Sequence, residues 1–452
     1  MKFRFTAEEL DELERGVFTE GWASEVRDIA IGSGSNPVGV YLMALARRLA
    51  QVPPEIGLPP LGMAGGKGSL NSIFMGVADS GGGKNVAWDL AKELAPYQES
   101  LIKVRHTGVG TGENLVNACI EYEKGEKGKR VRKGNYPSVF SMTTEARQLD
   151  KELARDTSKV AETMCDMWSG AYIGSVAAGD PDRWIDSHAT RWVCVLAIQT
   201  ANLGGFAAQL ATGLPQRIIW FPVGEPRTPS VMPERRILLP TMPKIPATGF
   251  FDGITLRVDS SILAELWRLR LEMQRGNLPE PDVHRAFAQE KLAAAIALSE
   301  ACFEVRGDHW ERAAAVMRLS DAVRDRAMEC QQARALEAAK AEEARKSTVR
   351  AHGRFVGAIA EGQVEGEYAE LITAMRDRIL TALGKVDRIA NEDLIRACGA
   401  HKGVLPREAF RVTVRFLADE GVIQRDPPDV ERGGGWRLAN STEAMNAGEG
   451  AL

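Results

Sequence analysis

A parallel, doubly wound α/β sheet is the fold class that the sequence predicts for the central part of the chain. Between Ser69 and Val223, short apolar runs alternate with longer segments of helical character, and this alternation is typical of parallel strands joined by helices. One run, Arg191 to Thr200 (RWVCVLAIQT), is apolar almost throughout, as expected for a strand buried on both faces. A glycine-rich turn follows the first run and leads into an amphipathic segment, which gives the order strand, loop and helix.

Length and composition favour several domains. A chain of 452 residues exceeds the size of one ordinary core. The formal net charge of -4 excludes a generally basic surface, so any contact with nucleic acid must come from local clusters of Arg and Lys. The six cysteines are scattered without a C-x-x-C pair, which is typical of reduced thiols in a cytoplasmic protein. No apolar run is long enough to cross a bilayer, so no membrane partner is expected.

The first 60 residues predict an N-terminal helical cap. Thr6 to Glu9 has the pattern of a capping box. A second helix is predicted by an apolar stripe made of Val38, Leu42, Ala44, Leu45 and Leu49. The proline-rich run from Val52 to Pro60 then ends this helix and connects it to the first strand.

The segment Asn71 to Leu90 (NSIFMGVADSGGGKNVAWDL) predicts a phosphate-binding P-loop. In such a loop, backbone N–H groups, a helix N-terminus and a lysine ammonium together hold a polyphosphate. Compared with the pattern G-x-x-x-x-G-K-[ST], Ala78 replaces the first glycine and Asn85 replaces the hydroxyl residue. The predicted ATP-binding residues are Ser80, Gly81, Gly82, Gly83, Lys84 and Asn85. The alternative is a glycine-rich surface turn without a ligand.

A second glycine-rich turn, Thr107 to Asn114 (TGVGTGEN), follows a strand candidate from Ser100 to Arg105. We expect it at another edge of the same crevice or as a tight turn without a ligand, and we expect a helix to about Glu123 after it. The basic segment Lys124 to Lys133 (KGEKGKRVRK) is interpreted as a mobile loop. A contact with nucleic acid or phosphate is the alternative for this segment.

The third predicted strand, Tyr136 to Thr144, has Glu145 at its exit. In P-loop ATPases a carboxylate at this place orients the attacking water or supports the metal. Glu145 is therefore the predicted catalytic carboxylate, and Asn85 and Glu145 are the predicted Mg²⁺ ligands. Thr144 replaces the expected Asp, so hydrolysis is expected to be slow or organised differently. The alternative is a solvated loop glutamate.

Two further residues are predicted to act on the phosphates. Gln199 ends the fourth strand, where an amide can sense the terminal phosphate; a simple strand-end amide is the alternative. Arg217 precedes the fifth strand, Ile218 to Val223. A guanidinium suits the charge on a transferring phosphoryl group, in the same chain or across a subunit boundary. The alternative for Arg217 is an ordinary salt bridge.

After the sheet, the proline-rich run from Pro222 to Pro246 predicts an irregular arm. Three helices are then expected to form a lid or bundle, at Ser260 to Arg275, Pro281 to Phe303 and Asp308 to Met328. The run from Gln331 to Arg350 has high helix propensity but little apolar face, which predicts an exposed connecting helix.

Three helices and a hairpin after Glu365 predict a winged-helix domain. On the third helix, Pro406 to Asp419, arginines recur every four residues and therefore share one face. This face is predicted to contact the phosphate backbone or the major groove of DNA, with additional contacts from the wing. The predicted DNA-binding residues are Arg407, Arg411, Arg415, Arg425, Arg432 and Arg437. A protein-docking module is the alternative.

Several motifs between Val17 and Arg324 together resemble predicted ATPases carried by phages and mobile elements of actinobacteria. The motifs are LPPLGMAGGKGSLNSIFMGVADSGGGKNVA, TGVGTGEN, the strands that end at Glu145 and Gln199, WSGAYIGS, GLPQRIIWFP and DHWERAAAVMRLSD. Such proteins are described as replicative helicase-like or primase-helicase-like. The resemblance implies a RecA-like or AAA+-like ATPase core that uses ATP and Mg²⁺ on single-stranded DNA or an origin duplex, as a homo-oligomer such as a hexamer.

By the same resemblance, Lys84 would bind phosphate, Glu145 would be catalytic, Gln199 would be a sensor and Arg217 would act in trans. The predicted domains are an N-terminal helical region (1–60), a P-loop ATPase core (61–250), a helical lid or bundle (251–330), a helical linker (331–364), a winged helix (365–440) and a disordered tail (441–452).

The predicted function is an ATP-dependent DNA-binding motor or replication initiator, helicase-like, of a phage or mobile element. A non-hydrolysing, nucleotide-gated DNA-binding regulator or helicase loader is the alternative, and Asn85 and Thr144 favour it. A third possibility is a structural scaffold with a vestigial P-loop.

Overall fold

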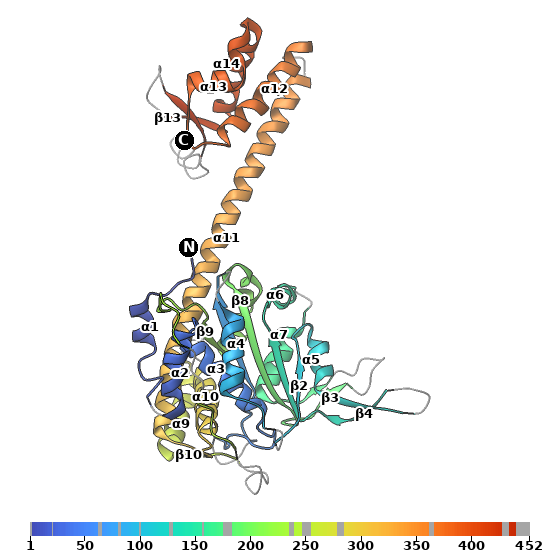
Figure 1. Cartoon of the computed structure of the whole chain (residues 1–452). Helices are drawn as coiled ribbons and strands as arrows, with labels where there is room; N and C mark the ends of the chain where they lie inside the picture. The colour runs from blue at the N-terminus through green and yellow to red at the C-terminus, as the bar shows by residue number, and fades with distance from the viewer. Residues whose placement is uncertain are drawn as a thin grey trace. The chain divides into compact units, whose positions relative to one another are not determined.

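The computed structural model contains two compact units, residues 1–332 and 333–452; Figure 1 shows the helices and strands along the chain. It describes residues 2–19, 21–61, 66–79, 83–98, 101–125, 130–155, 158–174, 183–234, 239–245, 255–277, 284–360, 366–426 and 434–439. No helix within these ranges has the length and apolar character that a membrane crossing requires.

A five-stranded parallel sheet forms the centre of the first unit. In spatial order its strands are β2 (Val104–Thr107), β5 (Ser138–Thr143), β8 (Arg191–Gln199), β1 (Ser72–Ala78) and β9 (Ile218–Pro222). All neighbouring pairs are parallel. The predicted parallel α/β sheet is therefore confirmed.

The remaining elements of the first unit are α1 (Ala7–Leu13), α2 (Gly21–Gly32), α3 (Pro37–Ala50), α4 (Lys84–Leu94), α5 (Gly112–Ala118), β3 (Ile120–Lys124), β4 (Arg130–Asn135), α6 (Arg147–Leu153), α7 (Val160–Ser169), β6 (Ile173–Gly174), β7 (Trp184–Ile185), η2 (Thr200–Asn202), α8 (Gly204–Ala208), η3 (Pro215–Arg217), β10 (Arg257–Val258), α9 (Ser260–Gln274), α10 (Arg285–Ser299), β11 (Glu304–Val305) and the first part of α11 (Gly307–Ala360). Residues 223–234 and 239–245 carry no helix or strand, as predicted for the proline-rich arm.

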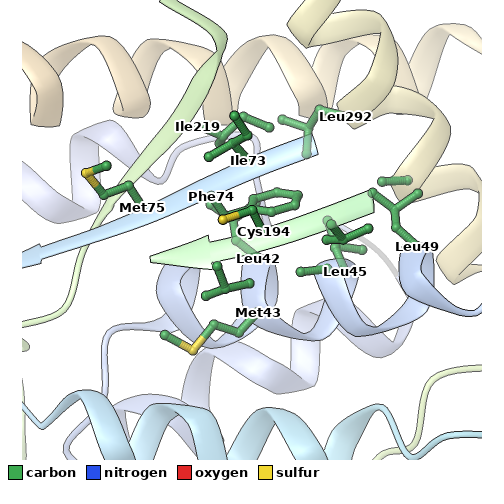
Figure 2. Close-up of a cluster of buried hydrophobic side chains, with 14 of the residues drawn as sticks. Leu42, Met43, Leu45, Leu49, Ile73, Phe74, Met75, Cys194, Ile219 and Leu292 are labelled. Atoms are coloured by element: carbon green, nitrogen blue, oxygen red, sulfur yellow. The ribbon is translucent and has the colours of Figure 1, made fainter. Parts of the chain in front are cut away.

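One hydrophobic core joins the sheet to helices from both ends of this unit. Every residue of α3 is buried, and α10, whose residues 288–299 are all buried, packs against α3. Figure 2 shows Leu42 and Leu45 of α3, Phe74 of β1, Cys194 of β8 and Leu292 of α10 in this core. The regions predicted as an N-terminal cap and a helical lid therefore share their core with the sheet. The alanine-rich sequence of α10 permits this close approach, because small side chains leave room for neighbouring elements.

The basic segment after α5 differs from its prediction. The helix expected to reach Glu123 ends at Ala118, and β3 then pairs antiparallel with β4. The described residues of the segment Lys124 to Lys133 therefore lie mainly in the paired strands β3 and β4, and residues 126–129 are outside the described part. Ile120 is buried and Tyr122 packs against the core. In β3 these two apolar residues alternate with Glu121 and Glu123, as expected for a strand with one buried face. After Glu145 the chain forms two helices, α6 and α7.

Within its described residues, the second unit contains the last part of α11, three further α-helices and a small antiparallel sheet. Its elements are α12 (Gly366–Leu383), β12 (Ile389–Ala390), α13 (Asn391–Ala397), η5 (Ala400–Lys402), α14 (Val404–Asp419), β13 (Ile423–Asp426) and β14 (Gly435–Leu438). The spatial order of the strands is β12-β14-β13. Phe410 and Leu417 of α14 pack with Met375 and Ile379 of α12. The three predicted helices and the hairpin are present, and β12 adds a third strand that was not predicted. The helices predicted to end at Met328 and to begin at Gln331 are one continuous helix, α11, which crosses the boundary between the units.

Stability is expected to fall as pH rises because of one buried carboxyl. Glu290 of α10 is only 7% exposed, and burial raises its pKa from 4.5 to about 7, although Lys291 lowers it in part. A raised carboxyl pKa gives stability that is complete below pH 4.5 and is lost as pH rises to about 7. We expect Glu290→Gln to remove this loss and to raise the free energy of unfolding at pH 8 by up to about 3 kcal/mol. Urea denaturation at pH 5 and pH 8 measures the effect.

The exposed Glu8 provides a matched control, because Glu8→Gln removes a carboxyl without changing a buried group. Equal losses of stability between pH 5 and pH 8 in Glu290→Gln and the unaltered chain would contradict this assignment.

Candidate functional site

The carboxyl ends of β1 and β8 mark the position of the candidate site. The chain leaves β1 toward β2 at one edge of the sheet, whereas it leaves β8 toward β9 at the other edge. Adjacent strands whose connections run in opposite directions open a crevice beyond their carboxyl ends. Ala78 and Gln199, the last residues of β1 and β8, are paired in register. The crevice therefore begins directly after these two residues.

The glycine-rich turn after β1 ends at Gly83, whose φ of 78° lies in the left-handed region that favours glycine. The helix α4 starts at the next residue, Lys84. Within the described residues no side chain caps this helix end, so its first N–H groups are positioned to meet an anion. Asn85 is the second residue of α4 and is exposed. The predicted ligands Ser80, Gly81 and Gly82 lie outside the described residues.

Lys84 and Glu145 come together beyond the carboxyl ends of the strands. The distance from Lys84 Nζ to Glu145 Oε1 is 3.6 Å, and their side chains are 26% and 76% exposed. Glu145 lies two residues after β5, and the N–H of the next residue, Ala146, donates to the carbonyl of Ala197 in β8 (3.0 Å). The turn that carries Glu145 is thus fixed to the neighbouring strand. An ion pair this exposed contributes about 1 kcal/mol or less, so an anionic ligand can displace the carboxylate from Lys84.

The second glycine-rich turn reaches the same end of the sheet. The N–H of Val109 donates to Thr143 Oγ1 at the end of β5 (3.1 Å), and the Thr111 side chain caps α5. This hydrogen bond puts Val109 of the turn at the carboxyl ends of the parallel strands, where the turn was expected. Gln199 is half-buried at the end of β8, and its role as a phosphate sensor stays a prediction.

Arg217 lies at the amino ends of the strands, whereas Lys84 and Glu145 lie at their carboxyl ends. It directly precedes β9, and Ile218 pairs with Ile73 near the start of β1. Arg217 Nη1 donates to the carbonyls of Thr212 (3.3 Å) and Gly213 (2.9 Å), and its guanidinium lies 5.4 Å from the centre of the Trp168 ring. The structure therefore does not bring Arg217 to Lys84 in the same chain, and no described salt bridge holds it. A role in trans stays a prediction.

Sequence reasoning missed two polar residues beside the turn. Asp79 follows β1 directly, and its Oδ1 accepts a hydrogen bond from Thr200 Oγ1 just after β8 (2.8 Å). Its Oδ2 accepts from the backbone N–H of Phe3 (3.1 Å). The available signal was a polar residue directly after each of two strands, but the sequence does not give the strand order that puts β1 beside β8.

A second candidate interface lies on α14. Arg407, Arg411 and Arg415 are exposed, and Arg415 lies 4.0 Å from Asp419. Phe410, Val414 and Leu417 of α14 are buried, so the arginines and these apolar side chains lie on different faces of the helix.

The predicted wing arginines do not form one group. Arg425 pairs with Trp436, and its guanidinium lies 5.6 Å from the ring centre. Arg437 pairs with Gln424, so it points to the other face of the hairpin, because side chains alternate along a strand. Arg432 lies outside the described residues.

One other cluster has the composition of a metal site. Glu300, Asp308 and His309 bring ligand atoms within 4.8 Å of one another. However, Arg312 donates to Glu300 (2.6 Å), and His309 Nδ1 accepts from the Arg306 N–H (3.0 Å). The arginine already supplies the positive charge, so we interpret this cluster as an ion-pair network.

No protein-family model matches the chain, and the comparison with curated proteins gives no match. The functional argument therefore depends on the geometry of the two candidate sites.

Proposed function

We propose that the chain is an ATP-dependent DNA-binding protein, a helicase-like motor or replication initiator that works as a homo-oligomer. The observation that carries this proposal is the 3.6 Å approach of Lys84 Nζ to Glu145 Oε1 beyond the carboxyl ends of β1 and β5. A lysine at a helix N-terminus, near a carboxylate from another strand, supports this proposal, because P-loop ATPases use such a lysine to bind phosphates and a residue of the second kind to position the attacking water.

In this proposal the turn from Ser80 to Gly83 is the P-loop, and Lys84 and the first N–H groups of α4 hold the β- and γ-phosphates. Glu145 orients the attacking water, while Lys84 offsets the charge that develops on the phosphoryl group. Mg²⁺ would neutralise further phosphate charge, with Asn85 and Glu145 as the side chains available to hold it. Gln199, at the end of β8, is the candidate sensor in this proposal.

The second unit is proposed to be a winged helix that binds DNA. Its three helices and three-stranded antiparallel sheet support this assignment, and the exposed arginines of α14 form a basic face of the kind that contacts phosphates. Arg425 lies beside Trp436 and Arg437 lies on the other face of the hairpin, so α14 is proposed as the principal DNA-binding element.

The decisive experiment measures ATP hydrolysis by the full chain with and without single-stranded or duplex DNA. A motor is expected to hydrolyse ATP and to be stimulated by DNA. Binding of ATP without hydrolysis would support the alternative, a nucleotide-gated regulator or helicase loader, which Asn85 and Thr144 favour. Absence of ATP binding by calorimetry would overturn both. Mass measurements with and without ATP test the homo-oligomer.

Removing the basic face of α14 is expected to weaken DNA binding and its dependence on salt. Each phosphate contact adds about 0.9 to the slope of log K against log salt. The combined change Arg407→Ala, Arg411→Ala and Arg415→Ala should therefore lower this slope by up to about 2.7. Fluorescence anisotropy with labelled DNA at several salt concentrations measures both quantities.

Arg396→Ala is the matched control, because Arg396 is an exposed arginine of the neighbouring helix α13 and pairs with Asp393. An unchanged slope in the triple variant would assign the DNA contact to another surface.

A further inference from the structure

We infer that Asp79 is a positioning residue that couples the proposed phosphate-binding turn to α11 through the N-terminal arm. The N-terminal arm is defined as residues 2–9. The inference rests on the proposed function, since the ligand of the turn is the ATP of that proposal.

Asp79 connects three parts of the chain at the carboxyl edge of the sheet. It lies between the end of β1 and the glycine-rich turn. One of its carboxylate oxygens accepts a hydrogen bond from Thr200 Oγ1, and the other accepts one from the backbone N–H of Phe3. Hydrogen bonds to a carboxylate are stronger than those between neutral groups. A shift of the turn on ligand binding therefore changes the position of the acceptor that holds the N-terminal arm.

The N-terminal arm is fixed by burial as well as by Asp79. Phe3 and Phe5 are 5% and 8% exposed, and their rings meet edge to face with centroids 5.6 Å apart. A capping box follows, in which Thr6 Oγ1 accepts from the Glu9 N–H (3.2 Å) and Glu9 accepts from the Thr6 N–H (2.8 Å). The arm is thus a packed segment that can transmit a displacement.

Arg326 of α11 holds the other end of the arm. It donates two hydrogen bonds to the Glu9 carboxylate (2.8 and 3.0 Å) and one to the carbonyl of Arg4 (2.8 Å). Its guanidinium also lies 4.0 Å from the centre of the Phe5 ring. The hydrogen bond from Arg326 is the largest cause that lowers the pKa of Glu9 to about 2. Figure 1 shows the N-terminus beside α11.

These contacts form a continuous path from the turn to a helix that leaves the first unit. The path runs from Asp79 to Phe3, along the arm to Phe5 and Glu9, and from there to Arg326. Because α11 continues past residue 332 into the second unit, the proposed nucleotide site is connected to the helix that leads to the proposed DNA-binding unit. Coupling between two sites is reciprocal, so loosening the arm on α11 must also change the affinity of the turn for ATP.

Hydrogen–deuterium exchange of the full chain with and without ATP tests this coupling. In the unaltered chain we expect ATP to increase protection in residues 76–90, in the arm and in residues 320–330 of α11. Arg326→Ala should keep the protection at residues 76–90, lose it at residues 320–330, and change ATP affinity by about 2- to 30-fold. Arg324→Ala is the matched control, because Arg324 lies on α11 but pairs with Asp321 and Asp325 instead of the arm.

A second comparison needs no nucleotide. Asp79→Ala should speed exchange in residues 2–9, and Asp79→Asn, which keeps a hydrogen-bond acceptor, should restore part of the protection. Protection of residues 76–90 by ATP without any change in the arm or α11, or retained protection of α11 in Arg326→Ala, would overturn the inference while leaving the proposed function intact. If ATP protects no part of the unaltered chain, the proposed function fails and this inference fails with it.

Discussion

Lys84→Ala is expected to weaken ATP binding by about 10- to 100-fold, the range for a lost hydrogen bond to a charged group. Turnover at saturating ATP should fall by about another 100-fold, because the ammonium also offsets charge that develops in the transition state. Lys84 is the first residue of α4, directly after a glycine in the left-handed conformation, so its ammonium and the helix N-terminus act on the same region. Calorimetry with ATP and a phosphate-release assay measure the two effects.

The same helix offers the control for this substitution. Lys92 lies two turns further along α4 and pairs with Asp89 at 2.6 Å, so Lys92→Ala removes an ammonium without touching the crevice. Equal ATP affinity in Lys84→Ala, Lys92→Ala and the unaltered chain would exclude Lys84 from the binding site and would remove the main support for the proposed function.

The strands of the sheet could be predicted because their signals are local. The apolar run of β8 reflects burial on both faces, and its predicted end at Thr200 differs from the observed end at Gln199 by one residue. The capping box of α1 was predicted for the same reason, since it involves residues three positions apart. Tertiary placement is less local: the nearly all-apolar sequence of α3 indicates a buried helix, but it does not say that the sheet and α10 are the elements that cover it.

The two parts of the candidate site show the same limit. Lys84 and Glu145 could be predicted to meet because both follow strands of one parallel sheet, and carboxyl ends of parallel strands share an edge. The same rule puts Arg217 at the amino ends of the strands, because Arg217 precedes its strand. Asp79 could not be predicted as a link to the N-terminal arm, since its partner Phe3 is 76 residues away in the sequence.

Glu145→Gln is expected to separate ATP binding from hydrolysis. An amide cannot accept the proton of the attacking water, so turnover should fall by about 100- to 10,000-fold, the range for losing a general base. ATP affinity should be unchanged or higher, because the substitution removes a negative charge that lies 3.6 Å from Lys84 Nζ. Single-turnover hydrolysis and ATP binding, measured on the same preparation, give both quantities.

The control for this change is Glu121→Gln in the β3–β4 hairpin, where the carboxylate pairs with Lys133 at 3.1 Å and lies outside the crevice. Unchanged turnover in Glu145→Gln would remove Glu145 from the reaction, and a parallel loss of binding would show that it has a structural role. If Glu145→Gln still binds DNA in an ATP-dependent manner, nucleotide binding alone controls the DNA-binding state and hydrolysis resets it. The motor and the regulator would then use the same two states, one with ATP bound and one after hydrolysis. The two proposals would differ only in the rate at which the bound ATP is hydrolysed.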